Sequence, residues 1–252
     1  MPESARYAYA VSRGVDEAAL AAVLGLLEQP LGVVRHRGLD AVVSDVPLEE
    51  FGEDALKQNL ESLPWLEKVA RAHHEVVDAV AALGATAPMR MATIFLDDDG
   101  VRQRLEEWHS ALEEVLDRVE HRAEWSVKVI AAVAETTEPV TAEPTSGTEF
   151  LRRRRTQVST NEDRLAELGR IAEAVHVDLS EVAVATRILA PQDPQLTGHT
   201  GTMALNGAYL VAEEDHARFA ARVADLVERL DQVHIESAGP WPPYSFAALE
   251  PS

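Results

Sequence analysis

The sequence predicts an α+β protein of two domains, and three observations lead to this fold class. Segments with the period of β-strands alternate with segments that have the period of amphipathic helices. From Trp125 onward, these segments begin a second ordered series. The chain has 252 residues, of which 46% are hydrophobic and 26% charged, which is ordinary for a globular protein and enough for two modest domains. We therefore expect an N-terminal domain over residues 1–124 and a C-terminal domain over residues 125–252.

The N-terminal domain is predicted to begin β-α-β-β and to continue with extra helices. Residues 5–11 have the aromatic and branched side chains of a strand, and Asp16 can cap a helix that runs to about Glu28. Two further strands meet at Arg37-Gly38, which predicts a hairpin. The remaining segments predict two amphipathic helices on either side of a strand, with the order 64–83, 87–96 and 101–119.

The C-terminal domain has the predicted order β-α-β-β-α-β. This is the ferredoxin-like pattern, an antiparallel sheet with two helices on one face. Its predicted strands and helices, in chain order, are 125–133, 150–175, 182–189, 202–211, 213–230 and 233–236. A tail rich in proline and aromatic residues, Gly239 to Phe246, follows the last strand and closes this domain as an irregular segment.

The charge balance and the absence of cysteine exclude several classes of function. Lysine and arginine number 23 and aspartate and glutamate 43, a net charge of −20, so the chain should repel phosphate backbones and anionic lipid surfaces. Without cysteine there is no disulfide, thiolate zinc site, iron–sulfur cluster or cysteine nucleophile. No apolar run approaches the roughly 20 residues of a membrane helix, and the start of the chain resembles a strand more than a signal peptide. We expect a cytoplasmic protein that binds neither nucleic acid nor membrane.

The common catalytic and nucleotide-binding motifs are absent, which predicts a protein that is not an enzyme and holds no cofactor. There is no phosphate-binding G-x-x-x-x-G-K-[ST] loop, no G-x-G-x-x-G after a strand and no G-x-S-x-G. We therefore predict no catalytic, cofactor-binding or metal-binding residues. A ligand-binding or enzymatic ferredoxin-like domain is the alternative, and it would need a pocket that joins His73 and Arg90 to acidic neighbours.

Two acidic or histidine-containing segments resemble metal sites only superficially. Asp97-Asp98-Asp99-Gly100 lacks the alternating ligands of a calcium loop, and position twelve is Trp108 instead of glutamate. We interpret it as a turn that caps the next helix. His73-His74-Glu75 is followed by Asp78 where a zinc protease needs histidine, so His73 is interpreted as a packed core residue.

Two segments leave a binding role open. Arg152 to Arg155 is a basic run within an acidic chain, and we interpret it as paired with nearby acids, with a docking patch for an acidic partner as the alternative.

The tail, Gly239 to Phe246, can be a rigid segment that packs over the sheet, which the residues favour, or a docking site, because tryptophan and tyrosine are common interface anchors. Under the docking interpretation, the candidate partner-binding residues are Trp241, Pro242, Pro243, Tyr244 and Phe246.

The tail also carries a family resemblance. Gly239-Pro-Trp-Pro-Pro-Tyr-Ser-Phe246 resembles the C-terminal signature of the gas vesicle F/L protein family (GvpF/GvpL). Weaker similarities run in order along nearly the whole chain and include Tyr7 to Val11, Leu39 to Ser44, Arg71 to His73, Pro88 to Phe95 and Gly207 to Val211. Met91 and Ala92 depart from the family pattern, which usually has phenylalanine and glycine there.

The resemblance implies an accessory or minor structural protein of gas vesicles, the gas-filled protein shells that give cells buoyancy. Such a protein is expected to bind the small hydrophobic shell protein of the GvpA type, together with other accessory proteins, and to assist vesicle nucleation or assembly. The resemblance also implies two α+β domains, the second ferredoxin-like, in agreement with the order of elements above.

Overall fold

A computed structural model describes residues 3–131, 147–192 and 201–247, with the backbone alone between 147 and 161. The chain forms two compact units, which are described separately. Unit 1 consists of residues Met1–Glu124 and Pro240–Ser252, and unit 2 consists of residues Trp125–Gly239. Each unit contains its own sheet, and the observed fold is α+β with two antiparallel sheets, as the sequence predicts.

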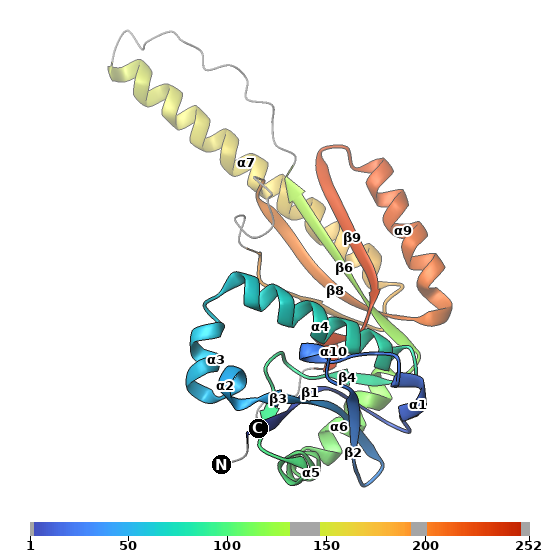
Figure 1. Cartoon of the computed structure of the whole chain (residues 1–252). Helices are drawn as coiled ribbons and strands as arrows, with labels where there is room; N and C mark the ends of the chain where they lie inside the picture. Colours follow the sequence, from blue (N-terminus) through green and yellow to red (C-terminus); the bar gives the residue numbers. More distant parts are fainter. Residues whose placement is uncertain (1–2, 132–146, 193–200, 248–252) are drawn as a thin grey trace. The chain divides into compact units, whose positions relative to one another are not determined.

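Unit 1 contains a five-stranded sheet, with helices between and after its strands (Figure 1). In chain order its elements are β1 (Ser4–Ser12), α1 (Glu17–Leu20), the 3-10 helix η1 (Leu26–Glu28), β2 (Leu31–His36), β3 (Leu39–Pro47), α2 (Leu48–Phe51), α3 (Glu53–Asn59), α4 (Leu63–Ala81), β4 (Thr86–Pro88), β5 (Ile94–Phe95), α5 (Asp98–Glu107), α6 (His109–Val119) and α10 (Tyr244–Ala247). The strand order is β2-β3-β1-β4, and β5 pairs with β1.

The strand register of unit 1 follows from a tight turn and a bulge. The β2–β3 hairpin pairs His36 with Leu39, and the connecting Arg37 and Gly38 have positive φ angles of 48° and 86°. Two such residues form the turn whose twist suits a two-residue hairpin, which confirms the hairpin prediction. Strand β1 pairs antiparallel with β3, and the register shifts between Ala8 and Ala10.

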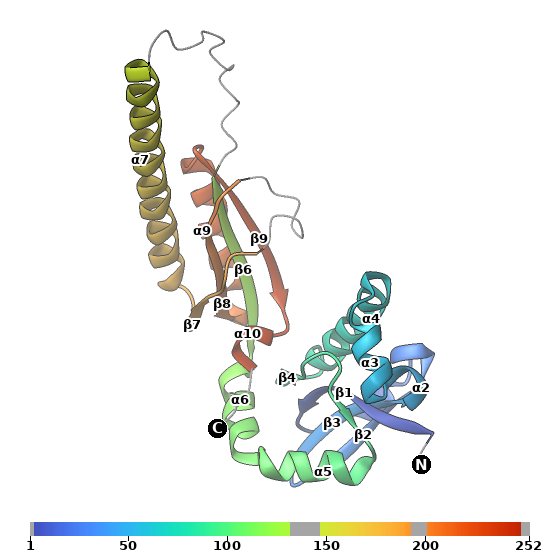
Figure 2. The same cartoon turned by 90° about the vertical axis from the view of Figure 1, so that its left-hand side faces the viewer.

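Helices cover both faces of the unit 1 sheet. Tyr7 and Tyr9 of β1 are fully buried in one core cluster with residues of α4, including Val76. On the other face, Ala8 lines a small closed space with side chains of α5 and α6, including Leu105. Figures 1 and 2 show α4 on one side of the sheet and α5 and α6 on the other. The aromatic residues of β1 are therefore held between the sheet and α4.

Unit 2 is built on a four-stranded sheet with two long helices (Figure 2). Its elements are β6 (Arg122–Ala131), α7 (Gly147–Ser180), β7 (Ala185–Ile188), β8 (Met203–Ala212), the 3-10 helix η2 (Glu213–Asp215), α9 (His216–Arg229) and β9 (Val233–Trp241). The strand order β7-β8-β6-β9 is the ferredoxin-like arrangement that the sequence predicts. Alternate residues of β6, such as Val127 and Val129, share one core cluster with Ile171 of α7 and Phe219 of α9. Both helices therefore pack on the same face of the sheet.

Three predicted elements of unit 1 are interrupted in the structure. The expected helix from Asp16 to Glu28 is only α1, which ends at Leu20, followed by η1, in which Leu27 and Glu28 have positive φ and lie outside the right-handed helical region. The expected helix over 101–119 is two helices that meet at Trp108, so α5 lies beside β2 and α6 beside β4. The expected strand over 87–96 is β4 and β5 around a turn, in which Ala92 has φ 64°.

The Pro/aromatic tail has a different place from the one expected. The sequence assigns it to the second domain, as an irregular segment after a strand that ends at 236. In the structure β9 continues to Trp241, and residues Pro240–Ser252 belong to unit 1. Helix α10 packs beside α6 and β4, because it finds hydrogen-bond and aromatic partners there.

Candidate functional site

The five candidate residues of the tail divide into a buried and an accessible group. Pro242 and Pro243 are buried, and Phe246 is only 3% exposed. Tyr244 is half-buried, whereas Trp241 is 42% exposed. The tail therefore packs into unit 1 through its buried residues, and these fix the position of the exposed Trp241.

Hydrogen bonds to both ends of its short helix hold the tail in unit 1. The carboxylate of Glu124 accepts the backbone N–H of Ser245 at 2.7 Å and its hydroxyl at 2.6 Å. The guanidinium of Arg118 donates to the carbonyl oxygen of Phe246 at 2.7 Å. Charge-assisted hydrogen bonds of this kind are stronger than neutral ones, so the tail is firmly anchored.

The tail packs against two consecutive histidines of α4, His73 and His74. The ring of Tyr244 lies 6.4 Å from that of His73 and 6.1 Å from that of His74, between centroids. The ring of Trp241 lies 5.6 Å from that of His74. The sequence places His74 in the segment His73-His74-Glu75 but does not indicate this contact, because its partners lie more than 160 positions later.

The inner part of this cluster is a buried hydrogen-bond chain. The hydroxyl of Tyr7 accepts the N–H of Ala92 at 3.0 Å and lies 3.0 Å from Nδ1 of His73. His73 is 4% exposed, which confirms it as a core histidine. Burial lowers the pKa of His73 to about 4, against a smaller opposite effect of the Met89 backbone. His73 is therefore neutral at pH 7, and its Nδ1 shares one hydrogen bond with the Tyr7 hydroxyl.

The tyrosines of the cluster are also held in their neutral form. Burial raises the pKa of Tyr7 and of Tyr244, and the nearby Asp78 raises that of Tyr244 further. Because His73 is neutral and both tyrosines are protonated, none of the three side chains carries a charge near pH 7. These contacts position the tail and do not form an acid–base pair.

The acidic turn at the start of α5 has the predicted capping role. The side chain of Asp97 accepts the N–H of Gly100 at 2.8 Å, which confirms it as the helix cap. Beside it, Arg6 donates to Asp98 and to Asp45, both at 2.7 Å. Both carboxylates are therefore paired with the same arginine. Across the residues that the structure describes, no group of three or more acidic or histidine side chains could hold a metal ion.

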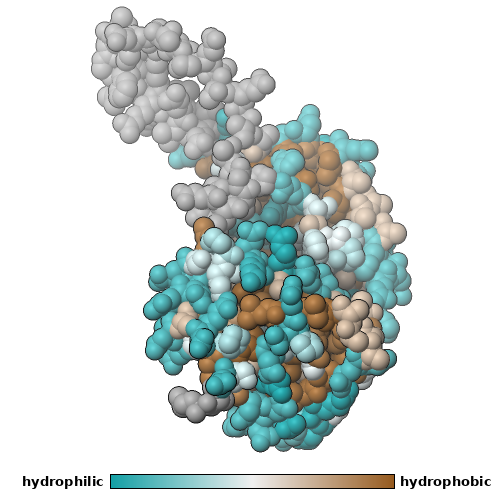
Figure 3. Space-filling view, in the orientation of Figure 1, coloured by the Kyte–Doolittle hydropathy of each residue, from teal (hydrophilic) through white to brown (hydrophobic). Residues whose placement is uncertain are grey.

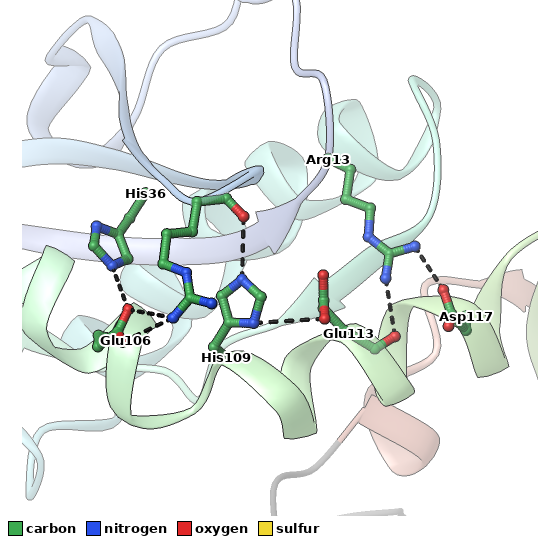
Figure 4. Close-up of polar contacts among 7 residues, drawn as sticks. Arg13, His36, Glu106, His109, Glu113 and Asp117 are labelled. Carbon is green, nitrogen blue, oxygen red and sulfur yellow. Dashed lines mark hydrogen bonds and ion pairs between the residues drawn. The ribbon is translucent and has the colours of Figure 1, made fainter.

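A second polar cluster joins the β2–β3 hairpin to α5 and α6 (Figure 4). Glu106 lies 2.7 Å from Nε2 of His36 and accepts from Arg37 at 2.8 Å, and these two partners lower the pKa of its carboxyl group. Further along, Arg13 donates to Asp117 at 2.6 Å. Each charged group drawn there already has a partner within unit 1. These polar contacts therefore connect α5 and α6 to the sheet of unit 1.

Other sequence candidates are not brought into a common site. Among the described residues, two open hollows with volumes of about 440 and 470 Å³ are lined by neither His73 nor Arg90. The run Arg152 to Arg155 lies in α7, but its side chains fall outside the described residues. None of the helices described is both long and apolar enough to cross a membrane.

Comparison with known proteins gives the family. The model of the family described as "Gas vesicle synthesis protein GvpL/GvpF" matches residues 5–248. The chain is 37% identical to gas vesicle protein L of Streptomyces sp. (strain CB03234), over 97% of this chain and 93% of that protein. It is 28% identical to gas vesicle protein L2 of Halobacterium salinarum, over 96% and 91%. It is 27% identical to gas vesicle protein F of the same Streptomyces strain, over 86% and 88%.

Solved structures show the same fold. The crystal structure of GvpF from Anabaena sp. PCC7120 superposes with a TM-score of 0.72 at 19% identity and covers 98% of this chain and 97% of that one. GvpF from Microcystis aeruginosa superposes with a TM-score of 0.69 at 17% identity, over 97% and 99%. The family model matched over residues 5–248 and the 37% identity to gas vesicle protein L show that the chain belongs to the gas vesicle GvpL/GvpF family.

Proposed function

We propose that this protein binds the hydrophobic shell subunit of gas vesicles in the cytoplasm and assists vesicle nucleation or assembly. The observation that carries the proposal is membership of the gas vesicle synthesis family, combined with an exposed tryptophan on a rigid support. The tail residues Trp241, Pro242, Pro243, Tyr244 and Phe246 form the proposed contact. Trp241 makes the contact itself, and the others hold it in place.

The geometry of the tail favours binding at low entropic cost. Pro242 and Pro243 restrict the backbone, and the buried Phe246 anchors its far end. A large aromatic side chain that is already ordered loses little freedom when a partner covers it. Tryptophan is also among the residues that contribute most at protein interfaces. Trp241 therefore has the properties of an interface anchor.

The surface charge suits a protein that carries an apolar partner. The net charge is −20, and hydrophilic residues surround the hydrophobic patches on the face drawn in Figure 3. A strongly charged body keeps a complex dispersed when its partner alone would aggregate. This property supports a role in holding or delivering the shell subunit before assembly.

A binding assay with the full chain and purified shell subunit tests the proposal. We expect Trp241→Ala to weaken the affinity by about tenfold or more, as for an interface anchor. Leu63→Ala is the matched control, because Leu63 is 73% exposed at the start of α4. If wild-type protein neither binds the shell subunit nor changes its aggregation, the function is refuted. If wild-type and Trp241→Ala proteins bind equally, the tail is not the contact.

A further inference from the structure

Trp108 of unit 1 shows how this protein combines a tryptophan, an arginine and a carboxylate. The guanidinium carbon of Arg104 lies over the Trp108 ring, 4.6 Å from its centroid. The same guanidinium pairs with the carboxylate of Glu107 at 3.0 Å. A cation over an aromatic ring is attracted by the negative charge of the ring face, and a neighbouring carboxylate adds to this attraction. The three side chains therefore bind a guanidinium from two directions.

Trp241 has an aromatic ring and a carboxylate in a comparable arrangement, but no arginine. Its ring lies 5.6 Å from that of His74, between centroids, and Nε2 of His74 lies 3.3 Å from the carboxylate of Asp78. Trp241 is 42% exposed, and the side chain of Asp78 is 45% exposed. In the described part of the chain, no lysine or arginine lies over the Trp241 ring or pairs with Asp78. Both groups are therefore accessible to a cation from another molecule.

The negative charge of Asp78 acts on the aromatic residues of the tail. The ring of Tyr244 lies 6.1 Å from that of His74, between centroids. Burial raises the pKa of the Tyr244 hydroxyl, and the charge of Asp78 raises this pKa further. A cation beside the tail is attracted by the same carboxylate and by the net charge of −20 of the whole chain. The charge of this surface is therefore complementary to a basic group.

Arginine fits this surface better than lysine does. Its planar guanidinium can stack on an exposed indole ring and still donate hydrogen bonds to a carboxylate, whereas an ammonium is a compact and strongly hydrated charge. Arg104 already makes this contact with Trp108 in the same unit. Small ligands bind in concave sites, and neither the open hollow nor the closed space described in unit 1 is lined by Trp241 or Asp78. The geometry therefore favours the side chain of a partner protein over a free small molecule.

We propose that Trp241 and Asp78 bind an arginine side chain of a partner protein, which stacks on the indole ring and donates to the carboxylate. This inference rests on the proposed function in one respect, namely that the tail is a contact surface, and it adds the chemical group that the partner supplies. His74 is a positioning residue, because its ring contacts Trp241 and its Nε2 lies beside Asp78.

Ligand-observed NMR with the full chain tests the requirement for a guanidinium. The probes are three short blocked peptides that differ only in their central residue, which is arginine, lysine or citrulline, the neutral analogue of arginine. We expect the arginine peptide to bind about threefold to tenfold more tightly than the citrulline peptide, the range of a cation–π contact at a partly exposed site. Equal binding of these two peptides overturns the proposal, and tighter binding of the lysine peptide refutes the stacked guanidinium.

Free arginine distinguishes a small-molecule site from a contact with a partner protein. Its α-carboxylate is repelled by Asp78, so free arginine should bind more weakly than the blocked arginine peptide. Equal or tighter binding of free arginine assigns the site to a small molecule and overturns the proposed partner.

Three variants locate the contact. Asp78→Asn removes the carboxylate of the site, and Asp54→Asn removes an exposed carboxylate of α3 with the same change in net charge. We expect Asp78→Asn to weaken binding of the arginine peptide by about twofold to fivefold, the range of an exposed ion pair, and Asp54→Asn to leave it unchanged. Trp241→Leu keeps an apolar side chain without a ring and should lose most of the preference for arginine over citrulline. Equal losses in the two aspartate variants show attraction to the net charge alone and overturn the site.

The outcomes separate this inference from the proposed function. The peptides contain no part of the shell subunit, so the arginine preference can be absent while the shell subunit still binds through Trp241, and then only this inference is wrong. An arginine preference that depends on Asp78, in a chain that does not bind the shell subunit, supports the site and refutes the proposed function. If neither the arginine preference nor binding of the shell subunit is observed, both are wrong.

Discussion

Glu124 and Ser245 are 121 residues apart in the sequence and are joined by two hydrogen bonds. The same carboxylate accepts the N–H of Ser245 at 2.7 Å and its hydroxyl at 2.6 Å. Glu124 is the last residue of the first segment of unit 1, and Ser245 lies in the segment that returns to it. The pair therefore connects two parts of one unit that are separated in the chain by the whole of unit 2.

The first prediction concerns the strength of this connection. Ser245→Ala removes the hydroxyl bond to a charged group, and we expect a loss of about 1–3 kcal/mol in the free energy of unfolding, measured with urea. Ser126→Ala is the control, because its hydroxyl makes only a long, exposed contact of 3.4 Å. Limited proteolysis should also cleave the tail faster in Ser245→Ala. Equal stability of the two variants contradicts the anchoring role.

The elements that the sequence predicts correctly are determined mainly by local interactions. The hairpin at Arg37-Gly38 depends on a two-residue turn, and the cap at Asp97 depends on an N–H three residues later. The β-α-β-β-α-β order of unit 2 is similarly visible, because each element has a clear period of its own.

The features that the sequence does not predict depend on distant residues. The helix expected from Asp16 to Glu28 ends at Leu20, and the following segment is held instead by the N–H of Leu26, which donates to the hydroxyl of Tyr9 on β1. The tail is placed by Glu124 and by the histidines of α4, which no local pattern connects to it. Trp241 is recognisable in the sequence, whereas its partner His74 is not.

The second prediction concerns the close packing at Gly25. A Cβ atom there would lie 2.6 Å from the hydroxyl of Tyr9 and 2.9 Å from Ser44, two residues that also share a 2.7 Å hydrogen bond. Gly25→Ala therefore forces this buried pair apart, and we expect a loss of about 1–3 kcal/mol, typical of overpacking.

Gly32→Ala provides the comparison for this prediction. Gly32 is in β2, and a Cβ atom there would have no neighbour within 4 Å. We expect this variant to be as stable as the wild type or slightly more stable, because alanine reduces the freedom of the unfolded chain. Thermal unfolding of the two variants measures the difference. A Gly25→Ala protein as stable as Gly32→Ala would show that the Tyr9 site can relax.

The third prediction tests the acidic turn as a cap. Asp97→Ala removes the acceptor of the Gly100 N–H, and we expect a loss of about 1 kcal/mol in the free energy of unfolding. Asp99→Ala, in which only an exposed ion pair with Arg102 is lost, should change the stability by less than about 0.5 kcal/mol. Millimolar Ca²⁺ should leave the wild-type Tm unchanged. A rise in Tm with Ca²⁺ that disappears in Asp97→Ala would instead indicate a metal site.

The fourth prediction concerns pH and the buried His73. Its pKa in the folded protein is about 4, below the ordinary value of 6.5, because burial disfavours the charged imidazolium. Between these pH values the unfolded chain binds the proton and the folded chain does not. The stability contributed by this difference is therefore complete above about pH 6.5 and declines as the pH falls toward 4.

The magnitude of this pH effect follows from the same two pKa values. The difference between 6.5 and about 4 corresponds to at most about 3 kcal/mol of stability lost by pH 4. We expect His73→Gln, in which this proton site is absent, to lose less stability than the wild type between pH 7 and pH 4.5, although it is less stable at pH 7. Urea unfolding at both pH values measures this.

His234→Gln is the control for this prediction, because the side chain of His234 is 61% exposed. Carboxylates that do not contact the substituted histidine contribute equally to the wild type and to both variants, and the exposed pair of His234 with Glu236 contributes little, so these effects largely cancel in the comparison. The loss of stability between the two pH values should therefore be the same for His234→Gln as for the wild type and smaller for His73→Gln alone. If all three proteins lose stability equally, His73 is protonated in the folded protein as readily as in the unfolded chain, and the neutral hydrogen-bond chain beneath the tail is incorrect.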